Sequence, residues 1–305
     1  MATIADAYIQ IIPSAEGISG NLSNILNNEA DSAGSASGNK FASAFSTGMK
    51  TLATGATVAF TAVTAGIASV TKASVESYAE FEQLEGGVET LFTPQQSMGE
   101  FVSQLEEIGV SAEEAAKRYE EYGTGAEKVM ENASEAYKTA GLSANQYMET
   151  VTSFSASLIS SLNGDTEASA KAANQAIIDM SDNANKMGTD MSLIQSAYQG
   201  FAKQNYTMLD NLKLGYGGTK TEMERLLKDA EKISGVKYDI SNLNDVYSAI
   251  HVIQTEMGIT GTTANEAEKT IAGSANALKG AFENLIAGFG NSSADIQTLC
   301  KNVAD

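Results

Sequence analysis

The feature that most constrains this fold is a run of apolar residues at helical spacing that begins at Phe41. Apolar side chains recur there at steps of three or four residues, and the average step is about 3.6, the period of an α-helix. The positions are Phe41, Phe45, Met49, Leu52, Ala56, Phe60, Val63, Ile67 and Val70. The pattern continues to Leu84, and one helix over 41–84 would be roughly 65 Å long at about 1.5 Å per residue. A compact domain could not bury such a helix along its whole length.

Residues 51–71 within this run carry no charged side chain. The length suits a membrane span, which needs about 20 apolar residues. The composition does not, because Ala, Thr, Gly and Ser make up most of the segment. Small residues let helix backbones approach closely, in membranes and in helical assemblies alike. The segment therefore favours helix–helix packing or self-association, and a transmembrane helix is the alternative.

The rest of the sequence predicts short helices with clear starts and ends. Ser or Thr followed three residues later by Glu or Gln is the capping-box pattern. It occurs at four expected helix starts: Thr93 with Gln96, Ser111 with Glu114, Ser143 with Gln146, and Thr263 with Glu266. We expect the last of these helices to run on to Phe289. Asp165 and Asp190 are further expected N-caps, and Gly188 is an expected C-cap.

The predicted fold is all-α, with one long N-terminal helix followed by a multi-helix domain. Residues 5–12 alternate imperfectly and predict one short strand. We expect four parts: an N-terminal arm and flexible linker over 1–40, the long small-residue-rich helix over 41–84, a helical domain over 85–290, and the start of a further helical segment over 291–305. We expect that last segment to continue in a longer polypeptide.

Composition excludes several function classes. The chain has 38 acidic and 19 basic side chains, a net charge of −19. DNA binding relies on Lys and Arg that neutralise phosphates, so no direct nucleic-acid binding is expected. Cys300 and His251 are the single cysteine and histidine, which excludes an internal disulfide and the usual Cys/His zinc sites. The N-terminus lacks the basic and apolar regions of a signal peptide, so synthesis in the cytoplasm without export is expected.

The sequence offers no convincing catalytic or cofactor site. His251 is the sole candidate for the usual general base, and its place between helical core positions indicates a structural histidine. Residues 215–221 resemble a phosphate-binding loop only in part, because Thr219 separates the glycines from the lysine. We therefore predict no enzyme activity and no cofactor.

A calcium site is also not predicted. Asp179, Asp182, Asn183 and Asp190 gather oxygen ligands, but the EF-hand spacing fails when it is counted from Asp182. We interpret these residues as a solvated and capped helix end, and we predict no metal site. From Glu100 to Glu135 there are ten acidic and three basic side chains, which indicates a solvated helix face or, as the alternative, a surface that binds a partner.

The candidate interaction site is the segment 205–221. Three leucines crowd into a short space and three glycines follow within four residues; the segment includes Leu209, Asp210, Leu212, Leu214, Gly215, Tyr216, Gly217 and Gly218. Glycine allows tight turns and close backbone approach. Thr221 and Glu224 match a capping box that would start the next helix. We interpret the segment as an apolar hinge between two helical blocks.

Residues from about 81 to 290 resemble the N-terminal region of tail tape measure proteins from phages and prophages of Gram-positive bacteria. The resemblance rests on four stretches: GVETLF at 87–92, AIIDMSDNANKMGT at 176–189, MLDNLKLGYGGT at 208–219 and EAEKTIAGS at 266–274.

The resemblance implies a structural virion protein that scaffolds the tail tube, helps to set tail length and lies in the tail lumen. Implied partners are other copies of itself through helices and coiled coils, the tail tube protein and the tail assembly chaperones. Family members are generally much longer, with a repetitive helical middle and sometimes a peptidoglycan-cleaving domain, neither of which is visible here. The alternative function is a membrane-active segment that aids DNA passage through the host envelope, with the host membrane as partner. A hydrolase is a third, weaker hypothesis.

Overall fold

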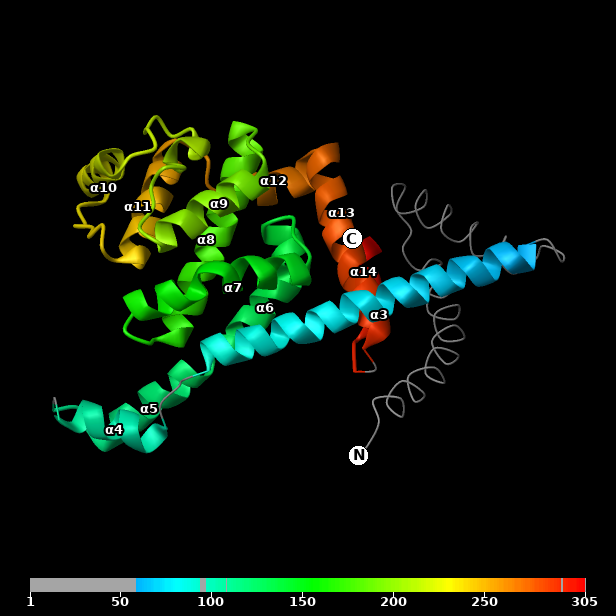
Figure 1. Cartoon of the computed structure of the whole chain (residues 1–305), viewed down its shortest axis with the longest axis horizontal. Helices are drawn as coiled ribbons and strands as arrows, with labels where there is room; N and C mark the ends of the chain where they lie inside the picture. The colour runs from blue at the N-terminus through cyan, green and yellow to red at the C-terminus, as the bar shows by residue number, and fades with distance from the viewer. Residues whose placement is uncertain (1–58, 94–96, 108, 292, 305) are drawn as a thin grey trace. The chain divides into compact units, whose positions relative to one another are not determined.

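The computed structural model describes residues 59–93, 97–107, 109–291 and 293–304 (Figure 1). Within these ranges the chain is helical and contains no strand, which confirms the all-α prediction. The predicted strand at 5–12 and the first part of the predicted long helix, 41–58, lie outside the described residues. The helix described from Ala59 passes the predicted end at Leu84 and stops at Phe92.

Helices account for nearly all of the described elements. Their bounds are α3 Ala59–Phe92, α4 Met98–Glu107, α5 Ala112–Gly123, α6 Gly125–Thr139, α7 Ala144–Ser161, α8 Thr166–Met187, α9 Met191–Ala202, the 3₁₀ turn η1 Leu209–Leu212, α10 Lys220–Ser234, α11 Leu243–Glu256, α12 Thr262–Lys269, α13 Ile271–Gly290 and α14 Ile296–Ala304. The chain forms two compact units. The described part of unit 1 comprises residues 59–81, 281–291 and 293–304, and unit 2 is Glu82–Gly280.

Unit 1 is held by close helix contacts. Gly290 at the end of α13 lies directly on α3, where an added Cβ would be 2.5 Å from Tyr78 Cβ and 2.7 Å from the Ser74 carbonyl oxygen. A second contact joins α13 to α14 around Leu285, Phe289 and Cys300. Glycine is required at such a crossing because any side chain would push the two backbones apart.

Unit 2 is built around α8, which packs against α5, α6, α7, α9, α11 and α12. Its inner face is lined by side chains that are fully or almost fully buried, including Ala173, Ile177 and Met180. Aromatic rings extend this core: Tyr198 lies 5.0 Å from Tyr247 between ring centroids, and Phe154 meets Tyr247 edge-on at 5.6 Å. Offset and edge-on arrangements of this kind are the favourable geometries for aromatic pairs.

Helix caps divide into those that the sequence identified and those that it did not. Ser143 and Gln146 form a complete capping box at α7, and Asp165 caps α8 by accepting from the Ala168 N–H at 2.8 Å. Gly188 ends α8 in the left-handed conformation with φ 60°. These predictions are confirmed, as is the helix start after Ser111.

Other predicted boundaries are wrong. The helix after Thr93 begins only at Met98, where Ser97 and Glu100 form a reciprocal pair. The helix expected from Thr263 to Phe289 is split at Thr270, whose extended backbone separates α12 from α13.

Thr263 is not the N-cap of α12 either. Gly261 occupies that position, and Asp182 of α8 accepts hydrogen bonds from the Gly261 and Thr263 N–H groups at 2.5 and 2.7 Å. A carboxylate from a distant helix therefore replaces the local cap.

We predict that Ser143→Ala lowers the free energy of unfolding by about 1 kcal/mol, because the substitution leaves the Gln146 N–H without its capping acceptor. Ser143 is buried, so water cannot substitute freely. Denaturant titration of the purified chain measures the change. Ser196→Ala is the matched control: its hydroxyl bonds only the carbonyl of Ser192 within α9, and we expect little or no loss. Equal effects from both substitutions would refute the capping argument.

Candidate functional site

Segment 205–221 is a folded loop between α9 and α10 that is anchored in the core of unit 2. Leu209 and Leu212 are fully buried and Leu214 is 6% exposed. The hydroxyl of Tyr206 donates to the Ile240 carbonyl at 3.1 Å and ties the start of the loop to the segment before α11. Any hinge motion here would have to expose these leucines to water, which costs roughly 1.5–3 kcal/mol for each side chain.

The other residues of the predicted site face outward. Asp210, Gly215 and Gly217 are exposed, while Tyr216 and Gly218 are half-buried. The segment thus presents a polar outer surface and an apolar inner one.

The loop is hydrogen-bonded to the end of α8. Asn183 donates to the Leu212 carbonyl at 3.0 Å, and Thr189 donates to the Asn211 carbonyl at 3.3 Å. The ammonium of Lys213 donates to the Met187 carbonyl at 3.0 Å, in the last turn of α8. A cation at a helix C-terminus is favoured by the helix dipole. Two of the stretches that carry the family resemblance, 176–189 and 208–219, are therefore adjacent in space.

Gly218 marks the closest backbone approach in the loop. A Cβ added there would lie 2.2 Å from the Thr207 carbonyl oxygen and 2.9 Å from its carbon. Both are backbone atoms, so neither can rotate away. This approach, rather than a positive φ, explains the glycine, and it closes the loop onto its own start.

Side chains of α10 hold the glycine-rich half of the loop. The Arg225 guanidinium stacks on the Tyr216 ring at 4.3 Å from its centroid and donates to the Gly215 carbonyl at 2.8 Å. The Gly217 N–H donates to Glu222 at 3.1 Å, and the Tyr216 hydroxyl donates to Asp229 at 3.1 Å. Burial and the neighbouring Asp229 carboxylate raise the pKa of Tyr216 to about 12. Tyr216 is therefore neutral at physiological pH and acts as a hydrogen-bond donor.

The N-cap of α10 is Thr219 and not Thr221 as predicted. Thr219 has an extended backbone, and its hydroxyl accepts from the Glu222 N–H at 3.2 Å. Both threonines stand three residues before a glutamate, so the sequence pattern fits two registers. The earlier register allows Glu222 to reach back to Gly217 and Arg225 to reach Gly215, and these contacts favour it.

His251 belongs to a second polar group in unit 2. Its Nδ1 atom lies 2.8 Å from Asp179 Oδ1, and Gln175 donates to the same oxygen at 3.1 Å. Asp179 and Asp182 are 1% and 0% exposed. The sequence-based interpretation of these aspartates as a solvated helix end is wrong, because one pairs with His251 and the other caps α12. The spacing of three residues, which puts both carboxylates on one face of α8, was the available signal.

The aspartates and asparagine at the end of α8 serve separate partners. Asp179 binds His251, Asp182 binds the start of α12, Asn183 binds the loop and Asp190 caps α9. Among the described residues, no group of three or more His, Cys, Asp or Glu side chains is arranged to hold a metal ion.

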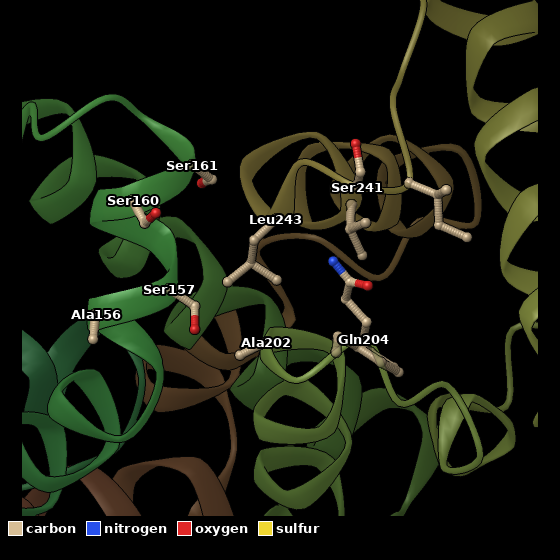
Figure 2. A pocket seen from close by; sticks show the side chains of 11 residues that line it. Ala156, Ser157, Ser160, Ser161, Ala202, Gln204, Ser241 and Leu243 are labelled. Carbon is tan, nitrogen blue, oxygen red and sulfur yellow. The ribbon is translucent and has the colours of Figure 1, made fainter.

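A separate pocket lies between the end of α7, the end of α9, and the start of α11 with the segment before it (Figure 2). Its volume is about 490 Å³. The polar groups that line it are the hydroxyls of Ser157, Ser160, Ser161 and Ser241 and the amide of Gln204, and its lining includes no ionisable side chain. Such a surface can hydrogen-bond an uncharged group. It supplies no general base to activate a serine.

No family model, curated protein or solved structure matches this chain.

Within the described part of the chain, none of the helices has the length and apolar character that crossing a membrane would require. Residues 51–58, the start of the predicted membrane alternative, lie outside that part.

We predict that Gly218→Ala destabilises the chain by about 1–3 kcal/mol, the usual cost of overpacking a tight site. Gly217→Ala is the matched control, because its added Cβ would meet only the Glu222 side chain at 3.6 Å and its φ is not positive. We expect that control to stay within about 1 kcal/mol of the wild type. Denaturant titration and near-UV circular dichroism measure both. A Gly218→Ala protein as stable as Gly217→Ala would contradict the close approach.

The His251–Asp179 pair predicts that stability falls as pH rises. Burial raises the pKa of Asp179 despite its hydrogen bonds, and the bond to Asp179 raises the pKa of His251 from its ordinary value of 6.5. Asp182 contributes to both shifts in the same direction. The folded chain therefore binds protons more tightly than the unfolded chain, and the stabilisation from His251 is present below pH 6.5 and lost as pH rises through its folded pKa.

Calorimetry at a series of pH values from 6 to 8.5 tests this, with an expected steady fall in Tm. His251→Gln should reduce the slope in that window, since the substituted side chain cannot titrate. Repeating the series in 0.5 M salt separates the pair from the general repulsion of an acidic chain, because salt screens exposed charges far more than buried ones. An unchanged slope in His251→Gln would remove the pair as the cause.

Proposed function

We propose that this chain is a structural protein of phage tail assembly, equivalent to the N-terminal part of a tape measure protein. The proposal rests on the four stretches of sequence that resemble that family. One observation supports it beyond the sequence: the 176–189 stretch is bonded to the 208–219 stretch and packs against α12, the helix in which the 266–274 stretch begins. The end of α8 bonds the 208–219 loop through Asn183 and bonds the start of α12, the helix that holds residues 266–269, through Asp182.

The polar residues in these stretches are used to join helices. Asn183, Lys213 and Asp182 bind backbone groups, and Asn185 donates to the Thr263 hydroxyl at 2.9 Å. These hydrogen bonds stabilise the arrangement of the helices. Removing one of these side chains would leave its hydrogen-bond partner unsatisfied, which is costly. A scaffolding role needs such an architecture and needs no reacting group, so we propose no enzyme activity.

The proposed mechanism depends on helical length. The 34 residues of α3 span roughly 50 Å at about 1.5 Å per residue. In the proposal the helix continues back to residue 41, and its small residues at 51–71 pack against other copies of the chain. Length in sequence then becomes length in space inside a tail. The partners proposed are further copies, the tail tube protein and the tail assembly chaperones, with the tail lumen as the location.

We predict that deletion of the codons for 82–280 from the encoding phage or prophage abolishes normal tails. Negative-stain electron microscopy of induced lysates measures tail number and length, and a wild-type copy supplied in trans should restore both. A phage that carries Gly218→Ala should show a partial defect at elevated temperature, while one that carries Gly217→Ala should not. Tails of normal number and length in the deletion would contradict the proposal.

A further inference from the structure

The helix pair α4–α5 carries apolar side chains that unit 2 does not bury. On α4, Met98, Phe101, Val102 and Leu105 follow the i, i+3, i+4, i+7 spacing of a single helix face. Met98 is 42% exposed and the other three are half-buried. Phe101 contacts Tyr119 of α5 with their ring centroids 5.6 Å apart. The two helices therefore share an apolar seam that water still reaches.

The pair is thinly attached to the core. Between residues 98 and 123, Ala115 is the one buried residue among those whose exposure the structure describes. α5 packs on α8 and α6, while α4 packs on α5, and Figure 1 places α4 at the edge of unit 2, beyond α5. Helices in proteins are stabilised mostly by burial of their apolar face. The apolar face of α4 remains partly exposed, and a partner helix could bury it.

The charges around the seam indicate which partner fits. From Glu100 to Glu121 there are seven acidic and two basic side chains. Glu106 lies one turn from Val102 on α4. On α5, Glu113 and Glu120 lie one turn from Ala116, which is itself one turn from the seam residue Tyr119. All three glutamates are exposed. A second copy of this chain would bring the same acidic border against itself, and like charges oppose that contact. The complementary partner has an apolar face with a basic border.

We propose that α4–α5 is a docking surface for a helix of another protein whose apolar face is flanked by Lys or Arg. The partner's apolar side chains cover Met98, Phe101, Val102 and Leu105, and its cations pair with Glu106, Glu113 and Glu120. This is the helix-in-groove mode of recognition. The inference rests on exposure and charge in α4–α5 and holds whether or not the chain acts in a phage tail.

Two synthetic 18-residue helical peptides test the proposal. Both carry the same Leu and Ala face, and the flanking positions hold Lys in one and Glu in the other. Fluorescence anisotropy with the full chain should show that the Lys peptide binds and that the Glu peptide binds at least about tenfold more weakly. Affinity for the Lys peptide should fall as salt rises, because exposed charges are screened.

Charge-reversal variants locate the site. Glu106→Lys, Glu113→Lys and Glu120→Lys together should reverse the preference between the two peptides. The control, Glu149→Lys, Glu231→Lys and Glu256→Lys, makes the same change in net charge at exposed positions elsewhere and should leave the preference intact.

Phe101→Ser with Leu105→Ser should weaken binding of the Lys peptide. The charge-reversal comparison remains decisive if that variant does not fold, because it changes only exposed side chains. Equal binding of the two peptides, or equal effects of the two reversal sets, would overturn the proposal.

Discussion

Unit 2 depends on the buried carboxylate of Asp182. It lies on the central helix α8 with no exposure to water and accepts two backbone N–H groups at the start of α12. A buried carboxylate without such partners would carry a large desolvation cost. The start of α12 has no capping side chain of its own. The Asp182 carboxylate therefore gains hydrogen-bond donors, and the start of α12 gains an acceptor. Removing either partner would leave polar groups of the other unpaired.

Other polar side chains of α8, close to Asp182, also hydrogen-bond segments that are distant in the sequence. Asp179 binds His251 of α11, and Asn183 binds the Leu212 carbonyl in the loop. Three polar residues of α8, at positions 179, 182 and 183, thus reach three segments that are distant in the sequence. Apolar burial brings these segments together without specifying their register, since hydrophobic contacts are non-directional. The polar contacts add direction, and this explains why Asp179, Asp182 and Asn183 stand among buried apolar residues such as Ile177 and Met180 in the 176–189 stretch.

Apart from the local cap of α4 at Ser97, the sequence predicted what depends on neighbouring residues and missed what depends on tertiary contact. Helical periodicity and the caps at Ser143 and Asp165 are local, and they were predicted correctly. The caps at Thr219 and Gly261 were missed, because the choice of register at Thr219 depends on Arg225 and Glu222 reaching the loop, and the cap of α12 comes from 79 residues away. The burial of Asp179 was missed as well, because an aspartate is usually solvated, although its spacing of three residues from Asp182 was a signal for a shared face of α8.

The acidic side chains of α8 differ from those of α4 and α5 in burial and in what they contact. On α8, Asp179 and Asp182 are buried, are bonded to His251 or to backbone N–H groups, and fix the architecture. On α4 and α5, acidic side chains remain exposed beside apolar residues that are only half-buried. If the acidic residues served only solubility, they would not need to border an uncovered apolar seam, and the seam itself lowers solubility. Their combination on one helix pair is better explained by recognition of a partner that covers the seam.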